Sequence, residues 1–347
     1  MFLKIKKKIE SELKSYIRHV DKAYTLNRTS PFLFQAIKDF ISREGKRIRP
    51  ILFVAGYLGF AKKEAPGLYR SALSIELMHD FMLIHDDIID KSATRRGRPS
   101  MHTVFNNHLA GRQNLKFKGE DLAIILGDIL YAMSLQAFLS IKEDKVRKEK
   151  AFRKLMDAAM YTGCGEFIEL MFGLKGIDKI SESDIYKIYD FKTANYTFAS
   201  PLGIGAILGG APDAEVQRLF RYGTYLGRAF QIKDDILGLF SEEKEIGKSI
   251  LTDLQEAKLT LLIRNAYHHS DKKNRLAISH ILSKKNVTKS DLLKIRKIIR
   301  SSGALDYARK QIIQCLKQAQ ALIRNSKMRT DYKSALTQYA QEILKLQ

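Results

Sequence analysis

Cysteine is scarce in this sequence, because only Cys164 and Cys315 occur among its 347 residues. Two cysteines are too few for a disulfide framework or a cysteine-rich metal site, and they suit a reducing compartment, so we expect a cytoplasmic protein. No run of about 18 uninterrupted apolar residues occurs, so we expect no transmembrane segment. The N-terminal stretch 1–17 lacks a sustained apolar core and a small-residue cleavage site, and it predicts an amphipathic helix rather than a secretory signal.

Sequence patterns of β-strands and of linkers are also missing. Apolar residues recur at helical spacing almost throughout, and the pairs Ser181/Asp184 and Thr288/Asp291 have the spacing of helix capping boxes. Prolines stand where helices could begin, at Pro31, Pro50, Pro66 and Pro212. The likeliest loops are residues 91–100, 108–119 and 240–249. We therefore predict an all-α protein, a helical bundle with one domain over residues 1–347.

The chain is strongly basic, with a formal net charge of +22 from 60 Lys and Arg against 38 Asp and Glu. This excess is compatible with nucleic acid, an anionic membrane surface or phosphorylated substrates, and equally with solubility alone. The two most basic stretches, residues 141–154 and 283–300, do not interleave aromatic residues with base-reading polar ones. We therefore expect no nucleic acid partner.

Three aspartates interrupt an apolar run in LIHDDIID, namely Asp86, Asp87 and Asp90. A helix would place Asp86 and Asp90 on one face with Asp87 beside them. Buried unpaired carboxylates are costly, and like charges one helical turn apart repel each other. A bound cation would offset this cost, so the cluster predicts a cation-binding site.

A second acidic pair, Asp234 and Asp235, interrupts the apolar run FQIKDDILGLF far along the chain. One such pair is weak evidence for a metal site, but two clusters in apolar helices are harder to explain by surface exposure alone. If the two helices face each other across a cavity, their oxygen ligands suit Mg²⁺, which prefers a few carboxylates together with water and substrate phosphates.

Basic residues stand close to both acidic clusters. Guanidinium groups bind phosphate through two hydrogen bonds, and lysine supplies a point charge. Each of these cations alone is more often a surface residue. Together they indicate binding sites for two anionic groups. The basic residues are Lys46, Arg47, Arg49, Arg95, Arg96, Lys248 and Lys258.

The order of these motifs from Gly45 to Lys258 resembles that of the trans-isoprenyl diphosphate synthases, the polyprenyl synthetase family. The motifs are GKRIRP, ELMHDF, DDIID, RRGRP, FKTANY and FQIKDD. The resemblance implies an all-α bundle around a central cavity and a homodimer. It also implies a Mg²⁺-dependent prenyltransferase that condenses isopentenyl diphosphate with an allylic diphosphate, head to tail, without a protein general base.

The resemblance assigns roles residue by residue. It implies metal ligation by Asp86, Asp87, Asp90, Asp234 and Asp235. It implies isopentenyl diphosphate contacts by Lys46, Arg49, His79 and Arg96. It implies allylic diphosphate contacts or catalysis by Arg95, Lys192, Thr193, Gln231, Lys248 and Lys258.

Three positions depart from the family pattern. Gly238 replaces the third aspartate of the second motif, and Ala257 replaces a glycine that often precedes the lysine. Glu166 stands where glutamine is usual, whereas Glu169 fits the family's acidic residue. The departures bear on individual contacts rather than on the reaction class.

Product length is expected to depend on Phe81 and Met82, five and four residues before Asp86. Helical geometry places them one turn below the first motif. By resemblance, a bulky Phe81 implies a shortened product, geranylgeranyl diphosphate, with farnesyl diphosphate as the close alternative. A core role for Phe81 is the competing interpretation.

Three other functions remain as alternatives. A class I terpene cyclase would share the scaffold and an acidic motif, but FQIKDD argues against it. A non-catalytic partner subunit would usually lose aspartates of the first motif, all of which are present here. A nucleic-acid-binding protein rests on net charge alone.

Overall fold

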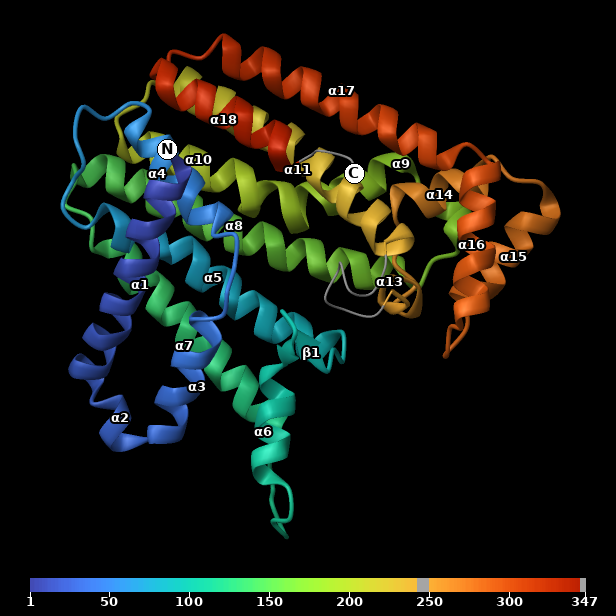
Figure 1. Ribbon diagram of the computed structural model, residues 1–347, viewed down its shortest axis with the longest axis horizontal. Helices are drawn as coiled ribbons and strands as arrows, with labels where there is room; N and C mark the ends of the chain where they lie inside the picture. Colours follow the sequence, from blue (N-terminus) through green and yellow to red (C-terminus); the bar gives the residue numbers. More distant parts are fainter. Residues whose placement is uncertain (242–249, 344–347) are drawn as a thin grey trace. The chain divides into compact units, whose positions relative to one another are not determined.

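A computed structural model describes residues 1–241 and 250–343 (Figure 1). The chain divides into two compact units. The first unit comprises Met1–Phe152 and Ile204–Gly210, and the second comprises Arg153–Gly203 and Ala211–Gln347. Helices form almost all of the described elements, which confirms the predicted all-α fold. The single-domain assignment stays a prediction.

The first unit is built around one buried helix, α5. Its elements are α1 (Phe2–Tyr24), α2 (Leu26–Thr29), α3 (Pro31–Ile41), α4 (Ile48–Leu58), α5 (Leu68–Ile89), β1 (Thr94–Arg95), β2 (Arg98–Pro99), α6 (Met101–Leu109) and α7 (Gly119–Leu139). Helix α5 packs against α7, α4, α1 and α6. Leu68 and the run from Ser71 to Asp80 are buried, whereas Tyr69 and Arg70 are half-buried. The helix can be buried on all sides because its apolar residues are distributed around it rather than along one stripe.

The second unit is arranged around α11. Its elements are η1 (Ile177–Lys179), α9 (Glu182–Ile188), the π-helix η2 (Tyr189–Ala199), α11 (Asp213–Phe240), α13 (Thr252–Gln255), α14 (Leu261–His268), α15 (Lys272–Leu282), α16 (Lys289–Ser301), α17 (Ala304–Arg324) and α18 (Thr330–Ile343). Helices α8 (Lys145–Phe172) and α10 (Ser200–Leu208) contribute residues to both units. Helix α11 packs against η2 and α17 and also touches α13, α14 and α16.

Local sequence signals account for several helix ends. Ser181 and Thr288 cap α9 and α16, each accepting a hydrogen bond from the backbone N–H of the aspartate three residues later, so both predicted capping boxes are confirmed. Pro31 occupies the first turn of α3. The amphipathic first helix is also confirmed, since α1 buries one apolar face that includes Ile9 and Leu13.

Two glycines allow a distant segment to complete the first unit. A Cβ atom on Gly205 would lie 2.0 Å from the carbonyl oxygen of Phe53, and one on Gly209 would lie 2.5 Å from that of Tyr57. The segment Ile204–Gly210 therefore packs directly on the backbone of α4, which no larger residue at either position would permit.

Within the described residues, α7 is the single helix whose length and apolar composition would let it cross a membrane. It packs on α5 and α6, and 44% of its most apolar window is buried inside the unit. Core helices of soluble proteins meet the same criterion, so this helix is weak evidence for a membrane span.

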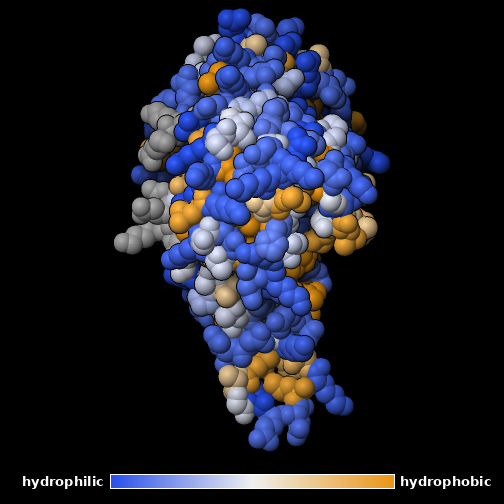
Figure 2. All heavy atoms as spheres, turned by 90° about the vertical axis from the view of Figure 1, so that its right-hand side faces the viewer, coloured by the Kyte–Doolittle hydropathy of each residue, from blue (hydrophilic) through white to orange (hydrophobic). Residues whose placement is uncertain are grey.

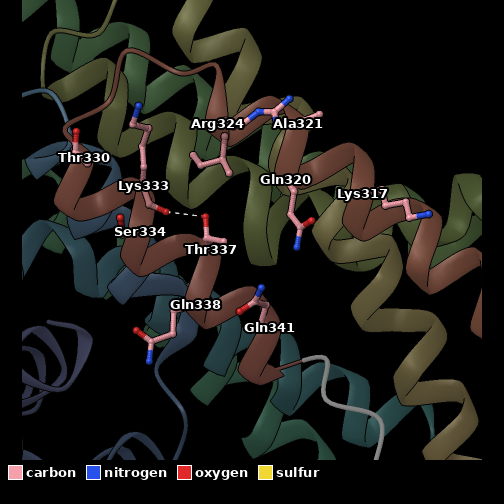
Figure 3. A pocket seen from close by; sticks show the side chains of 11 residues that line it. Lys317, Gln320, Ala321, Arg324, Thr330, Lys333, Ser334, Thr337, Gln338 and Gln341 are labelled. Atoms are coloured by element: carbon pink, nitrogen blue, oxygen red, sulfur yellow. Dashed lines mark hydrogen bonds between the residues drawn. The ribbon is translucent and has the colours of Figure 1, made fainter.

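One face of the second unit is mostly polar. The face that includes α15 and α16 is covered largely by hydrophilic side chains, with apolar ones between them (Figure 2). A hollow of about 760 Å³ lies between α17 and α18, lined by Lys317, Arg324, Lys333 and several amide side chains (Figure 3). None of the predicted site residues lines it.

Candidate active site

The first acidic cluster lies at the C-terminal end of α5. Asp86 and Asp87 are in its last turn, Asp90 is the C-cap residue, and no basic residue of the helix stands in that turn. The C-terminal end of a helix carries the negative end of its dipole. Three carboxylates there are electrostatically unfavourable without a cation. Asp86 and Asp90 are half-buried, whereas Asp87 is fully buried.

One cation for this cluster comes from the following loop. The Arg95 guanidinium donates two hydrogen bonds to Asp87 Oδ1, and its Nε lies 2.7 Å from that oxygen. Burial raises the pKa of the Asp87 carboxyl, and the Arg95 guanidinium opposes that rise. Asp87 thus holds Arg95 beside Asp86 and Asp90.

The loop itself folds into a short hairpin that the sequence did not indicate. β1 and β2 pair antiparallel, with Arg95 opposite Arg98. The two turn residues, Arg96 and Gly97, have φ of 53° and 70°. Positive φ at both positions is the pattern of a type I′ turn, which is strained for arginine and natural for glycine.

This turn directs Arg96 into the protein. Its Nη2 atom lies 3.8 Å from Asp80 Oδ1, and the Asp80 side chain is 1% exposed. Neither carboxylate oxygen of Asp80 has a hydrogen-bond partner. Burial, and then the charge of Glu76, raises the pKa of Asp80 to about 8. His79 lies in the same buried stretch, and burial together with Arg49 and Arg96 lowers its pKa well below the usual range, so its imidazole is neutral near pH 7.

The three cations of GKRIRP have different environments. Lys46 is exposed and Arg49 is half-buried, whereas the Arg47 side chain is 1% exposed. Arg47 pairs with Glu76 and with Glu10, each at 2.8 Å, and also donates to two backbone carbonyls. Arg47 therefore joins α1, α4 and α5, while Lys46 and Arg49 remain candidates for binding an anion.

The predicted chain-length residues are neighbours in α5 and point in different directions from its axis. Met82 is buried, and Phe81 packs edge-on against His85 and at 5.1 Å from the ring of Tyr131 in α7. His85 lies directly over Gly127 of α7, where a Cβ atom would be 2.4 Å from its Nε2. The Phe81 ring thus faces α7 one turn before the aspartates.

In the second unit, Lys192 of η2 is held by two carboxylates of α8. Its Nζ atom lies 2.6 Å from Glu166 and 2.5 Å from Glu169. A Cβ atom on Gly165 would lie 2.9 Å from the backbone nitrogen of Lys192, so this glycine allows α8 to approach η2 closely. Glu166, which stands where glutamine is usual, therefore places a second carboxylate beside Lys192.

The second acidic pair is divided between solvent and protein. Asp234 is exposed, whereas Asp235 is 5% exposed. Gln231 donates to Asp235 Oδ1 at 2.9 Å and accepts a hydrogen bond from the Thr193 hydroxyl at 2.7 Å. The structure thus brings together Thr193, Gln231 and Asp235, while Asp234 points outward.

Of the two remaining predicted cations, the structure describes Lys258, which follows α13. Lys258 lies 3.3 Å from Glu256, and Ala257 has φ of 50°, the left-handed conformation that suits the glycine usual at this position. Lys248 lies outside the described residues. Among the residues that are described, no three His, Cys, Asp or Glu side chains converge into a protein-only metal cage.

Sequence reasoning missed four residues that the structure places beside predicted ones: Glu76, Asp80, His85 and Tyr189. Glu76 and Asp80 could have been found, because both are acidic residues inside a buried apolar run, like the aspartates that were recognised. His85 and Tyr189 carry no comparable signal, since a single aromatic residue in an apolar helix is most often core.

Comparison with known proteins places the chain among related sequences and folds. The family model described as Polyprenyl synthetase matches residues 30–299. The short chain isoprenyl diphosphate synthase of Methanocaldococcus jannaschii is 30% identical over 306 residues, covering 88% of this chain and 84% of that protein. The geranylgeranyl diphosphate synthase of Sulfolobus acidocaldarius is 31% identical, covering 86% and 85%.

A solved structure has the same fold. It is the geranylgeranyl pyrophosphate synthase of Corynebacterium glutamicum complexed with isoprenyl diphosphate and magnesium. The TM-score is 0.89 at 24% identity, covering 99% of this chain and 98% of that one.

Proposed function

This chain belongs to the polyprenyl synthetase family and is a prenyltransferase, and we propose that it joins isopentenyl diphosphate to an allylic diphosphate by head-to-tail trans elongation. The observation that carries the proposal is the acidic cluster at the C-terminal end of α5, with Arg95 held beside it. A helix end that combines several carboxylates with a guanidinium suits a diphosphate bound through a divalent cation.

We propose Mg²⁺ as the metal. The donor set consists only of carboxylate oxygens, and no complete cage of protein ligands forms within the described part of the chain. Both features fit Mg²⁺, which keeps several waters and takes ligands from substrate phosphates. As ligands of Mg²⁺ ions we propose Asp86 and Asp90 in the first unit and Asp234 in the second, because these carboxylates are more accessible than their buried neighbours Asp87 and Asp235. When bound, the metal stabilises negative charge on the leaving diphosphate.

The cationic side chains neutralise and orient the two substrates. We assign Arg95, Lys192 and Lys258 to the allylic diphosphate, and Lys248 is assigned there too, although it lies outside the described residues. Lys46, Arg49, Arg96 and the neutral imidazole of His79 are assigned to isopentenyl diphosphate. Preorganised charges of this kind lower the barrier for loss of diphosphate. The double bond of isopentenyl diphosphate then attacks the allylic cation, and the released diphosphate takes up the proton.

We propose geranylgeranyl diphosphate as the product, with Phe81 limiting its length. Support comes from the packing of Phe81 on Tyr131 of α7 one turn before Asp86, and from the similarity to the Sulfolobus acidocaldarius enzyme. If the product tail extends along α5 toward α7, the bulky side chains of Phe81 and Tyr131 stand in its path.

We propose a second copy of this chain as the protein partner. In the first unit, α7 exposes Ile124 and Ile125, at 42% and 55%. In the second unit, α8 exposes Phe167 at 66%, with Leu170 and Met171 beside it. Apolar side chains gathered on two long helices favour burial against another protein surface.

Two cysteines without disulfides, Cys164 and Cys315, suit function in the cytoplasm.

Turnover with defined substrates tests the activity. The purified protein is incubated with Mg²⁺, labelled isopentenyl diphosphate and dimethylallyl, geranyl or farnesyl diphosphate, and the products are sized by chromatography. We expect Asp86→Ala to lower kcat at least about a thousandfold, because it removes a ligand of the metal. Asp306→Ala, which removes an exposed aspartate of α17, serves as the matched control and should leave kcat unchanged. Near-normal kcat in Asp86→Ala would refute the metal assignment.

A further inference from the structure

A continuous chain of hydrogen bonds links three elements of the second unit. The backbone N–H of Leu261, the first residue of α14, donates to the Tyr189 hydroxyl at 3.0 Å. The Tyr189 hydroxyl donates to Asp235 Oδ2, and Gln231 donates to Asp235 Oδ1 at 2.9 Å. Thr193 donates to Gln231 Oε1 at 2.7 Å. The chain therefore runs from α14 through η2 and α11 back to η2.

The packing of α11 on η2 makes this contact possible. Gly223, Gly227, Gln231 and Asp235 follow each other at four-residue intervals and share one face of α11. A Cβ atom on Gly223 would lie 2.4 Å from Cα of Ala199, and one on Gly227 would lie 2.4 Å from Cα of Ala194. The two glycines let the helices touch backbone to backbone, and the next two residues on that face reach η2 with polar groups.

The chemistry of the partners fixes the direction of every hydrogen bond. Asp235 accepts hydrogen bonds from both Tyr189 and Gln231, so Gln231 turns its NH₂ group toward Asp235 and its carbonyl oxygen toward Thr193. The Thr193 hydroxyl must then donate to Gln231, and its lone pairs remain for other partners. The Tyr189 hydroxyl accepts from the Leu261 N–H and donates its own proton to Asp235.

We propose that Tyr189 is a positioning residue for the reaction, which acts through Asp235 and Gln231 to fix the orientation of the Thr193 hydroxyl. It also ties the start of α14, three residues after Lys258, to the helix that carries Asp234. This inference rests on the proposed function, because Lys258 is assigned there to the allylic diphosphate and Asp234 to its metal, and the family resemblance implies an allylic contact or catalytic role for Thr193. Tyr189 is buried, and we assign it no contact with either substrate.

Removing one hydroxyl group tests the proposal. Tyr189→Phe keeps the ring and removes the donor to Asp235 and the acceptor for the Leu261 N–H. We expect kcat to fall about tenfold, the equivalent of one charge-assisted hydrogen bond, while KM for isopentenyl diphosphate changes less than about twofold. The matched control is Tyr186→Phe, in the preceding turn, whose hydroxyl bonds Gln311 Oε1 at 3.1 Å instead. It should leave kcat unchanged.

A double-mutant cycle distinguishes positioning from general support of the fold. If Tyr189 acts through Thr193, then Tyr189→Phe should lower kcat little further in a Thr193→Val background. Additive losses would overturn the proposal, as would a kcat for Tyr189→Phe within about twofold of the parent.

Hydrogen exchange gives a readout that does not depend on activity. The Leu261 amide should exchange faster in Tyr189→Phe and at the parental rate in Tyr186→Phe. An unchanged Leu261 rate in Tyr189→Phe would overturn the hydrogen-bond chain. Absence of turnover in the parent protein, with the Leu261 effect present, would refute the proposed function and, with it, the positioning role of Tyr189, while leaving the hydrogen-bond chain in place.

Discussion

Replacing Arg47 should destabilise the protein far more than replacing its neighbour Lys46. Arg47→Met keeps the aliphatic stem but removes the guanidinium that pairs with Glu76 and Glu10 at 2.8 Å. The Glu76 side chain is 3% exposed and would be left as a buried charge without its partner. Breaking a buried ion pair in this way costs about 3–5 kcal/mol. At an unfolding entropy of ~2.1 cal/mol/K per residue, that cost lowers Tm by about 4–7 °C in a chain of 347 residues.

Thermal unfolding followed by circular dichroism measures this effect. Lys46→Met is the matched control, because Lys46 is exposed and surface changes usually stay within about 0.5 kcal/mol. The double variant Arg47→Met/Glu76→Gln should regain most of the lost stability, since no uncompensated charge then remains on Glu76. A Tm of Arg47→Met within about 1 °C of the parent, or a double variant no more stable than the single one, would refute the reasoning.

Three further predictions follow from the site. The raised pKa of Asp80, about 8 against 3.8 when unfolded, means that the native state alone holds this proton between those values, so stability falls as the pH rises through that window. Asp80→Asn should flatten the fall in Tm from about pH 5 to about pH 8, and an unchanged slope would contradict the burial of this carboxyl. Phe81→Ala should lengthen the product measured by chromatography, because it opens space toward α7, and an unchanged product would remove Phe81 from the chain-length argument. Glu166→Gln should lower KM for the allylic diphosphate about threefold, because Lys192 loses one of its two carboxylates. A KM equal to that of the parent would show that Glu169 alone holds Lys192.

Features that depend on short sequence spacing could be predicted. The capping boxes at Ser181 and Thr288 were found because the partners of each box are three residues apart. The aspartates of α5 stood out because charge contradicts its apolar surroundings, and the family resemblance supplied the reaction class. Periodicity likewise gave the all-α fold.

Features that depend on tertiary contacts could not be predicted. Nothing in GKRIRP distinguishes buried Arg47 from exposed Lys46, since the difference arises from Glu76 and Glu10 on other helices. The hairpin at Arg96 was missed because a turn with arginine at positive φ contradicts the usual turn residues. The link from Tyr189 to Asp235 joins residues 46 positions apart.

The first unit is built from two separate segments of the chain, and this constrains how the protein can fold during synthesis. Its helix α4 receives its packing partner Ile204–Gly210 only after the ribosome has added more than 50 residues beyond Phe152. At about 5–20 residues per second, the nascent first unit exposes part of its core for roughly 3–12 s. During that interval it is a natural client for chaperones. A chain released at Phe152 would keep that exposed surface permanently.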